Sequence, residues 1–128
     1  KGSVPPTKES FVRGLAAAGF DRAIPEYERF VAQNPAFKLD EDALYGWGAE
    51  LAQLGRPAQA REIFRLGAHL YPNKSFMHDG LGEMQAKTGQ AAEALASYRR
   101  VLELDPKNAD ALRYVKEHSA AAQGASSP

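Results

Sequence analysis

A period of 34 residues is the feature that most constrains the fold of this chain. When residues 41–74 are aligned with residues 75–108, nine positions are identical, whereas typical residue usage supplies about two or three. An alanine, an aromatic residue and a proline also recur with the same spacing in three places. These triplets are Ala23, Tyr27 and Pro35, then Ala60, Phe64 and Pro72, then Ala94, Tyr98 and Pro106. The pattern indicates one structural unit that occurs about three times.

Each unit carries residues that suit a pair of closely packed helices. A glycine without Cβ lets two helices approach, an aromatic side chain fills the space between pairs, a second glycine allows a left-handed turn, and a proline ends the second helix. In the two later units these are Gly48 and Gly82, Phe64 and Tyr98, Gly55 and Gly89, and Pro72 and Pro106.

The period and these motifs resemble the tetratricopeptide repeat. Leu44-x-x-Trp47-Gly48-x-x-Leu51 and His78-x-x-Leu81-Gly82-x-x-Gln85 stand where that family has its W-x-x-L-G-x-x-Y stretch. The resemblance implies an all-α, helix-turn-helix solenoid of about three repeats with a C-terminal capping helix.

The repeat register predicts the domain organisation. Residues 1–6 read as a linker, 7–122 as the repeat domain and 123–128 as a flexible tail. The first and second triplets lie 37 residues apart, so three residues are inserted near 37–40 and the first repeat is degenerate. We expect repeats at about 7–40, 41–74 and 75–108, with helices near 8–18, 20–34, 41–54, 57–70, 75–88 and 91–104, and a capping helix at 109–122.

The capping helix has its own start signal and an apolar stripe. Asn108 is a good N-cap, and Asp110 lies in the first turn. Leu112, Val115 and Ala122 form the stripe, with His118 between them. We expect this stripe to cover the last repeat, whose apolar end would otherwise face water.

Composition excludes several classes of protein. Sixteen basic and sixteen acidic residues give a formal net charge of zero, which argues against a nucleic-acid-binding protein. The absence of cysteine excludes disulfide scaffolds, thiolate zinc sites and cysteine nucleophiles. No stretch approaches 18 apolar residues, so we expect no transmembrane segment. The chain reads as soluble, and the choice between bacterial cytoplasm and periplasm stays open.

A search for catalytic motifs gives only coincidences. The sequence contains no Gly-x-Ser-x-Gly and no Ser-x-x-Lys. Lys87-Thr88-Gly89 and Tyr71-Pro72-Asn73 have the form of β-lactamase motifs, but the repeat register already explains Gly89 and Pro72. His69, His78 and His118 lack metal-ligand spacing, and arginines such as Arg56, Arg61, Arg65, Arg99 and Arg100 read as a solvated face. We expect no catalytic residue, no metal and no cofactor.

A narrower resemblance concerns the C-terminal helical extension of certain bacterial serine hydrolases, both esterases and β-lactamase-like enzymes. Its most specific pieces here are residues 40–44, 60–73, 79–83 and 102–106. The resemblance implies an accessory domain whose catalytic part lies in a longer parent chain. It would agree with a sequence that begins at Lys1 and not with Met.

The first helices of tetratricopeptide units line a concave surface, which is the usual peptide-binding face of that family. At i, i+3, i+7 spacing this surface receives acidic and aromatic residues. The carboxylate clamp of chaperone adaptors is absent, because Ala49 and Glu83 stand where asparagines are expected. The groove suits a basic or aromatic segment, and the candidate partner-binding residues are Asp42, Tyr45, Phe76, Asp79, Glu83 and Arg113.

Three hypotheses of function follow. The first is a non-catalytic interaction module that binds a peptide segment or a neighbouring domain in its concave groove. The second is the accessory domain of a serine hydrolase, and the third is a self-associating array whose oligomeric state light scattering would reveal. The alternative for the groove itself is a set of solvated side chains on a structural spacer.

Overall fold

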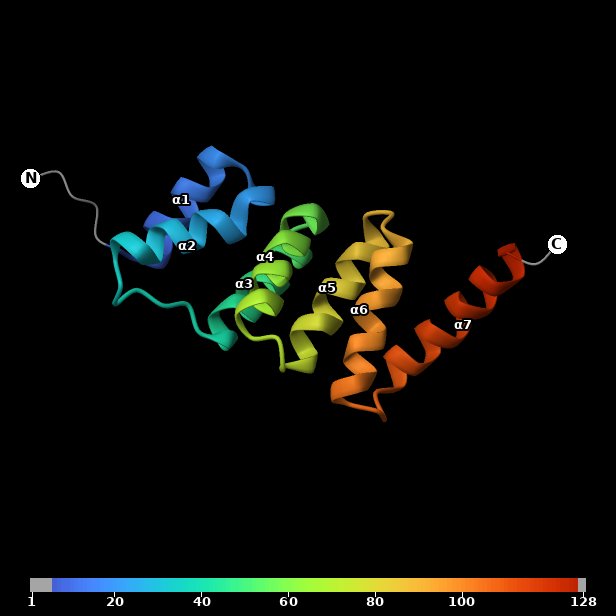
Figure 1. Ribbon diagram of the computed structural model, residues 1–128. Helices are drawn as coiled ribbons and strands as arrows, with labels where there is room; N and C mark the ends of the chain where they lie inside the picture. The colour runs from blue at the N-terminus through green and yellow to red at the C-terminus, as the bar shows by residue number, and fades with distance from the viewer. Residues whose placement is uncertain (1–5, 127–128) are drawn as a thin grey trace, which may run out of the picture.

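The computed structural model describes residues 6–126, and side chains up to Ser119. The first five residues, which hold most of the predicted linker, and the last two lie outside this range. Helices follow one another in an elongated row with the termini at opposite ends (Figure 1). The predicted all-α solenoid is confirmed, since the described residues contain helices and no strand. The elements are α1 (Lys8–Ala18), η1 (Phe20–Arg22), α2 (Ala23–Gln33), α3 (Glu41–Gln53), α4 (Pro57–Leu70), α5 (Ser75–Lys87), α6 (Ala91–Leu104) and α7 (Ala109–Ser126).

The two regular helix pairs, α3–α4 and α5–α6, turn at glycines. Gly55 and Gly89 have φ angles of 75° and 81°, in the left-handed region that favours glycine. Pro72 and Pro106 each follow two residues after the end of a second helix. Both roles are as the repeat register predicts.

The aromatic residue of the second unit packs between two glycines of different helices. A Cβ added to Gly48 on α3 would lie 2.7 Å from the ring of Phe64, and one added to Gly80 on α5 would lie 2.8 Å from the same ring. The Phe64 ring therefore joins its own helix pair to the next. Tyr98 packs on Gly82 of its own helix pair, where a Cβ would be 3.0 Å from its ring.

Helix α4 packs against α3 and α5, α6 packs against α5 and α7, and the first helices α3 and α5 also contact each other. The second helices α2 and α4 contact each other as well. The most deeply buried large side chains are Leu15, Leu44, Ile63, Leu66, Met77, Met84 and Val101. None of the helices in the described part of the chain is long and apolar enough to cross a membrane.

The degenerate first unit joins the rest in a different way. Helix α2 packs on α4, and rings of Phe11, Tyr27, Phe30 and Phe37 form a cluster that reaches Trp47 on α3. The segment between α2 and α3, which holds the inserted residues, is pinned at the buried Leu39. The inserted residues therefore belong to an ordered connection, residues 34–40, which we call the strap.

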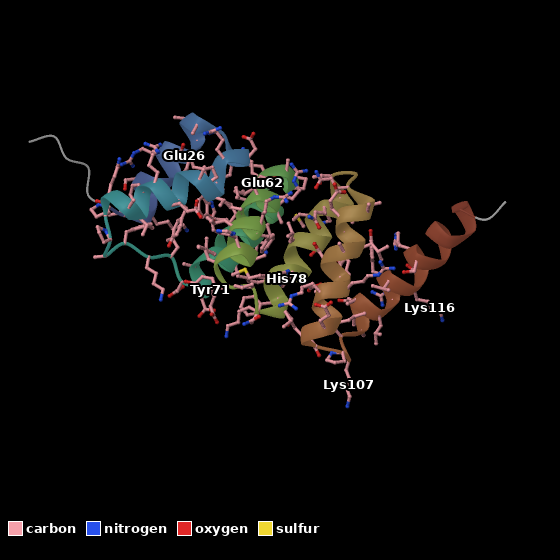
Figure 2. The ribbon with its side chains drawn as sticks, in the orientation of Figure 1. Glu26, Glu62, Tyr71, His78, Lys107 and Lys116 are labelled. Carbon is pink, nitrogen blue, oxygen red and sulfur yellow. The ribbon has the colours of Figure 1, made fainter. Side chains whose placement is uncertain are left out.

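Two tyrosine hydroxyls hold the backbone of Leu39. The Leu39 amide donates a hydrogen bond to Tyr27 Oη at 3.1 Å, and Tyr71 Oη donates one to the Leu39 carbonyl at 2.8 Å. Tyr71 lies just after α4, beside the segment that leads into α3 (Figure 2). Burial, followed by the charges of Tyr27, Asp40 and Glu41, raises the pKa of the Tyr71 hydroxyl.

Helix α7 begins as predicted, and its buried face agrees with the predicted stripe only in part. The Asn108 side chain accepts a hydrogen bond from the Ala111 amide at 2.9 Å, which confirms the N-cap. The predicted stripe is wrong at Leu112, which is 49% exposed. Val115 packs against the cluster that α6 and α7 share, as predicted, together with Ala111, which is fully buried, and Tyr114.

The repeat register explains the exposure of Leu112. Two periods earlier stands Leu44, one turn before Gly48 on the face of α3 that packs on α4. Leu44 is fully buried, but no second helix follows α7 among the described residues. Helix α7 continues to Ser126, past residue 122 where the capping helix was predicted to end, in a run of alanines that favours helix. The predicted tail at 123–128 therefore begins inside this helix, and the side chain of Ala122 lies outside the description.

Candidate functional site

Two of the predicted groove residues, Tyr45 and Phe76, form an aromatic pair between the first helices α3 and α5. The ring of Tyr45 on α3 meets the ring of Phe76 on α5 edge to face, with 5.3 Å between centroids. Tyr45 also lies 5.5 Å from Phe64 and remains 39% exposed. Tyr45 is therefore an exposed ring that two other aromatic rings hold in place.

Phe76 is part of the core as well as of the candidate groove. Its side chain is partly buried and packs against the main hydrophobic cluster. A change at Phe76 therefore affects the stability of the fold as well as the groove. Tyr45 is the cleaner probe of partner binding, because its ring is the more exposed of the two.

A surface pocket of about 280 Å³ lies between α5, α6 and α7. It brings together Asp79, Glu83 and Arg113 from the predicted set, one turn further along α5 from Phe76. Asp42 does not line this pocket and is exposed in the first turn of α3. The full lining is Asp79, Glu83, Tyr98, Asp110, Arg113, Tyr114 and Glu117.

The charges in this pocket are unevenly paired. Arg113 forms an ion pair with Asp110 at 2.8 Å, and Glu83 forms one with Lys87 at 3.7 Å. Asp79 has neither an ion pair nor a hydrogen bond with any other described residue. Burial, and then the neighbouring carboxylates of Asp110 and Glu83, raise the pKa of Asp79. Its ionised form is therefore poorly compensated.

Tyr98 forms the inner wall of the pocket and was assigned only to the core by the sequence. Its side chain is 7% exposed, and its ring lies 4.5 Å from that of Tyr114. Burial, and then the charges of Asp79 and Glu83, raise the pKa of Tyr98 far above its usual value. The hydroxyl makes no hydrogen bond within the described part of the chain. Tyr98 is a buried residue, but its hydroxyl oxygen remains accessible to solvent, so it is free to hydrogen-bond a ligand.

The other candidate residues have structural partners. Arg61 donates to Glu62 and to Thr88 Oγ1, each at 2.8 Å, so it ties α4 to the end of α5. The His78 ring lies 2.8 Å from the Pro72 carbonyl, on the loop before α5 (Figure 2). Trp47 is 5% exposed and belongs to the core. Among the described residues, no three histidine, cysteine or acidic side chains are placed to share a metal ion.

Comparison with known proteins identifies the repeat. The sequence model of the tetratricopeptide repeat family matches residues 76–108. The first tetratricopeptide domain of Spaghetti (RPAP3), solved with the HSP90 peptide SRMEEVD, superposes with a TM-score of 0.61 over 91% of this chain and 90% of that one, at 22% identity. The fold is a tetratricopeptide-repeat solenoid.

Two further proteins share this similarity. A mutant of MamA superposes with a TM-score of 0.50 over 74% of this chain and 67% of that one, at 24% identity. Cellulose synthase operon protein C from Xanthomonas axonopodis pv. citri (strain 306) is 38% identical over 57% of this chain. The chain spans only 5% of that relative. The narrower resemblance to the serine-hydrolase extension finds no support in these proteins.

Proposed function

We propose that this tetratricopeptide solenoid is a non-catalytic interaction module whose inner groove binds an extended protein segment. The segment belongs to a partner chain or to a neighbouring domain. The observation that carries the proposal is the exposed Tyr45–Phe76 pair, which lies next to the acidic pocket on the same side of the row. Such a surface offers an apolar anchor followed by polar groups that orient a ligand.

The aromatic pair supplies most of the expected affinity. Aromatic side chains dominate the energetics of protein interfaces, and truncation of one such residue costs about 2 kcal/mol or more. Tyr45 is held by Phe64 and Phe76, so little side-chain entropy is lost when a partner covers it.

The charge of the groove indicates the kind of segment. The HSP90 peptide in the Spaghetti complex is SRMEEVD, in which three residues are acidic and one is basic. Here the pocket holds four carboxylates and one guanidinium. Opposite charges favour encounter and specificity, so the segment recognised by this chain is basic or aromatic, unlike that peptide.

A catalytic role is not part of the proposal. The pocket is lined by carboxylates, tyrosines and one arginine, without a serine or lysine nucleophile beside a base. We expect the chain to hydrolyse neither ester nor β-lactam substrates. A turnover rate that survives stringent purification and disappears on substitution of Ser75 or Ser97 would contradict this.

The proposal is tested by display of random peptides against the chain, followed by affinity measurements on the enriched peptides. We expect Tyr45→Ala to weaken binding by about 2 kcal/mol, or about 30-fold, at every salt concentration. Reversal of Asp79 and Glu83 to lysine should weaken binding mainly at low salt, where the Debye length is about 30 Å at 0.01 M.

Two results would contradict the proposed groove. One is the failure of every peptide to bind above background while the chain is folded and monomeric by light scattering. The other is an affinity that ignores both Tyr45→Ala and the Asp79 and Glu83 reversals. Binding would then lie elsewhere, on the arginine-bearing outer face for example.

A further inference from the structure

Two polar side chains that line the pocket between α5, α6 and α7 have no hydrogen-bond partner among the described residues. Asp79 is an acceptor without an ion pair or hydrogen bond among the described residues, and the buried residue Tyr98 carries a solvent-accessible hydroxyl without a partner there. Both groups are open to solvent, so a ligand can take the place of water at each of them. Both would be satisfied by one ligand group that carries several N–H donors.

The surroundings select the sign of that ligand group. Asp110 is neutralised by Arg113, while Asp79 and Glu117 have no ion pair in the described part of the chain. The ring of Tyr114, stacked on His118 at 3.7 Å, closes one side of the pocket, and its partner ring Tyr98 forms the inner wall. Carboxylates with aromatic walls bind ammonium and guanidinium groups and repel anions.

We propose that this pocket receives the cationic head of one lysine or arginine side chain of the bound segment, held between the Asp79 carboxylate and the Tyr98 hydroxyl. The inference rests on the proposed function and names the residue that the groove selects. The ammonium or guanidinium donates to the Asp79 carboxylate, and the Tyr98 oxygen accepts a further hydrogen bond. The apolar stem of the side chain leads back along α5 toward Phe76 and Tyr45.

The experiment uses four pools of short random peptides that differ only in one fixed central residue. This residue is lysine, arginine, acetyl-lysine or norleucine, so that length is kept while charge is removed. Because a hydrogen bond to a charged group contributes about 1.5–3 kcal/mol, we expect the lysine or arginine pool to bind at least tenfold more tightly than both neutral pools. The comparison of lysine with arginine identifies the preferred head group.

Two variants assign this preference to the pocket. Asp79→Asn should abolish the preference for a cation, whereas Glu93→Gln, which neutralises an exposed carboxylate of α6 outside the pocket, should keep it. Tyr98→Phe keeps the ring and removes only the hydroxyl, and it should reduce the preference severalfold without a loss of melting temperature. Circular dichroism and thermal unfolding confirm that each variant is folded.

The outcomes separate this inference from the proposed function. Binding of all four pools with equal affinity, still weakened by Tyr45→Ala, would overturn the cation pocket and leave the groove intact. A cation preference that survives Asp79→Asn would also overturn it. Binding of no pool would overturn both, while a preference lost in Asp79→Asn and kept in Glu93→Gln supports the pocket.

Discussion

The ring of Phe64 lies against Gly80 of the next repeat, at the point where a Cβ on that glycine would be 2.8 Å from the ring. The contact is made between two helix pairs and not within one. It links the second and third units because Gly80 has no Cβ and leaves room for the Phe64 ring. Substitutions at this junction therefore report on coupling between repeats.

Gly80→Ala should destabilise the fold by about 1–3 kcal/mol, because the new methyl group overpacks against Phe64. Gly46→Ala on α3 is the matched control, since nothing lies within 4 Å of its added Cβ. That change should stabilise the chain by about 0.5–1 kcal/mol through helix propensity. Urea unfolding measures both. Equal stabilisation by the two substitutions would show that the Phe64 ring is not held against Gly80.

Tyr71→Phe should lower the free energy of unfolding by about 1 kcal/mol, because the Leu39 carbonyl loses its hydrogen bond in a buried place. Tyr45→Phe is the control, since the Tyr45 hydroxyl has no hydrogen bond within the described residues. Thermal unfolding of the two variants checks the difference. An unchanged Tyr71→Phe protein would mean that water serves the Leu39 carbonyl equally well.

The two large apolar residues at the start of α7 should respond differently to truncation. Leu112→Ala is expected to change stability by less than about 0.5 kcal/mol, as for other exposed positions. Tyr114→Ala removes a ring that packs on Tyr98 and should cost about 2 kcal/mol. Chemical unfolding separates the two. A larger loss in Leu112→Ala would restore the stripe that the sequence predicts.

Asp79→Asn should raise the melting temperature at neutral pH. The groups that face Asp79 in its pocket are Glu83, Asp110, Arg113, Glu117 and the tyrosines Tyr98 and Tyr114. Burial and the nearby carboxylates raise the pKa of Asp79 above 3.8, its ordinary value.

The sign of the pH effect follows from this direction. Below pH 3.8 the carboxyl is protonated in both the folded and the unfolded chain, so the wild type and Asp79→Asn should be equally stable there. As the pH rises through the raised pKa, the folded wild type must ionise a poorly compensated group and loses stability relative to the variant. Thermal unfolding at about pH 3 and pH 7 measures this, and a variant that is less stable at pH 7 would contradict it.

The sequence predicts most of the fold because the decisive signals are local. Gly55 and Gly89 mark turns, Pro72 and Pro106 mark helix ends, and the predicted boundaries of α3 to α6 differ from the observed ones by no more than one residue. These positions act through backbone geometry within a few residues. Because the sequence repeats, each of these assignments is made twice.

Contacts between residues far apart in the sequence were harder to predict. The strap at Leu39 depends on Tyr27 and Tyr71, which lie 12 and 32 residues away, and no periodic signal marks such a contact. Helical spacing grouped Leu112 with Val115, and Val115 does pack against α6. The spacing could not show that no second helix covers Leu112 among the described residues. The acidic side of the pocket followed from Asp79 and Glu83. Tyr98 did not, because the same aromatic position in Phe64 serves only packing.

The strap at Leu39 determines where an additional repeat can be inserted into the array. At the junction of the second and third units the contact is an aromatic ring against a glycine, Phe64 on Gly80, and it involves no hydrogen bond. A duplicated unit could be spliced in there, because each repeat contacts mainly its neighbours. At the junction of the first and second units, the backbone of Leu39 is hydrogen-bonded to Tyr27 on one side and to Tyr71 on the other. An extra unit inserted there would separate Tyr27 from Tyr71, so the first two units form a single module for recombination.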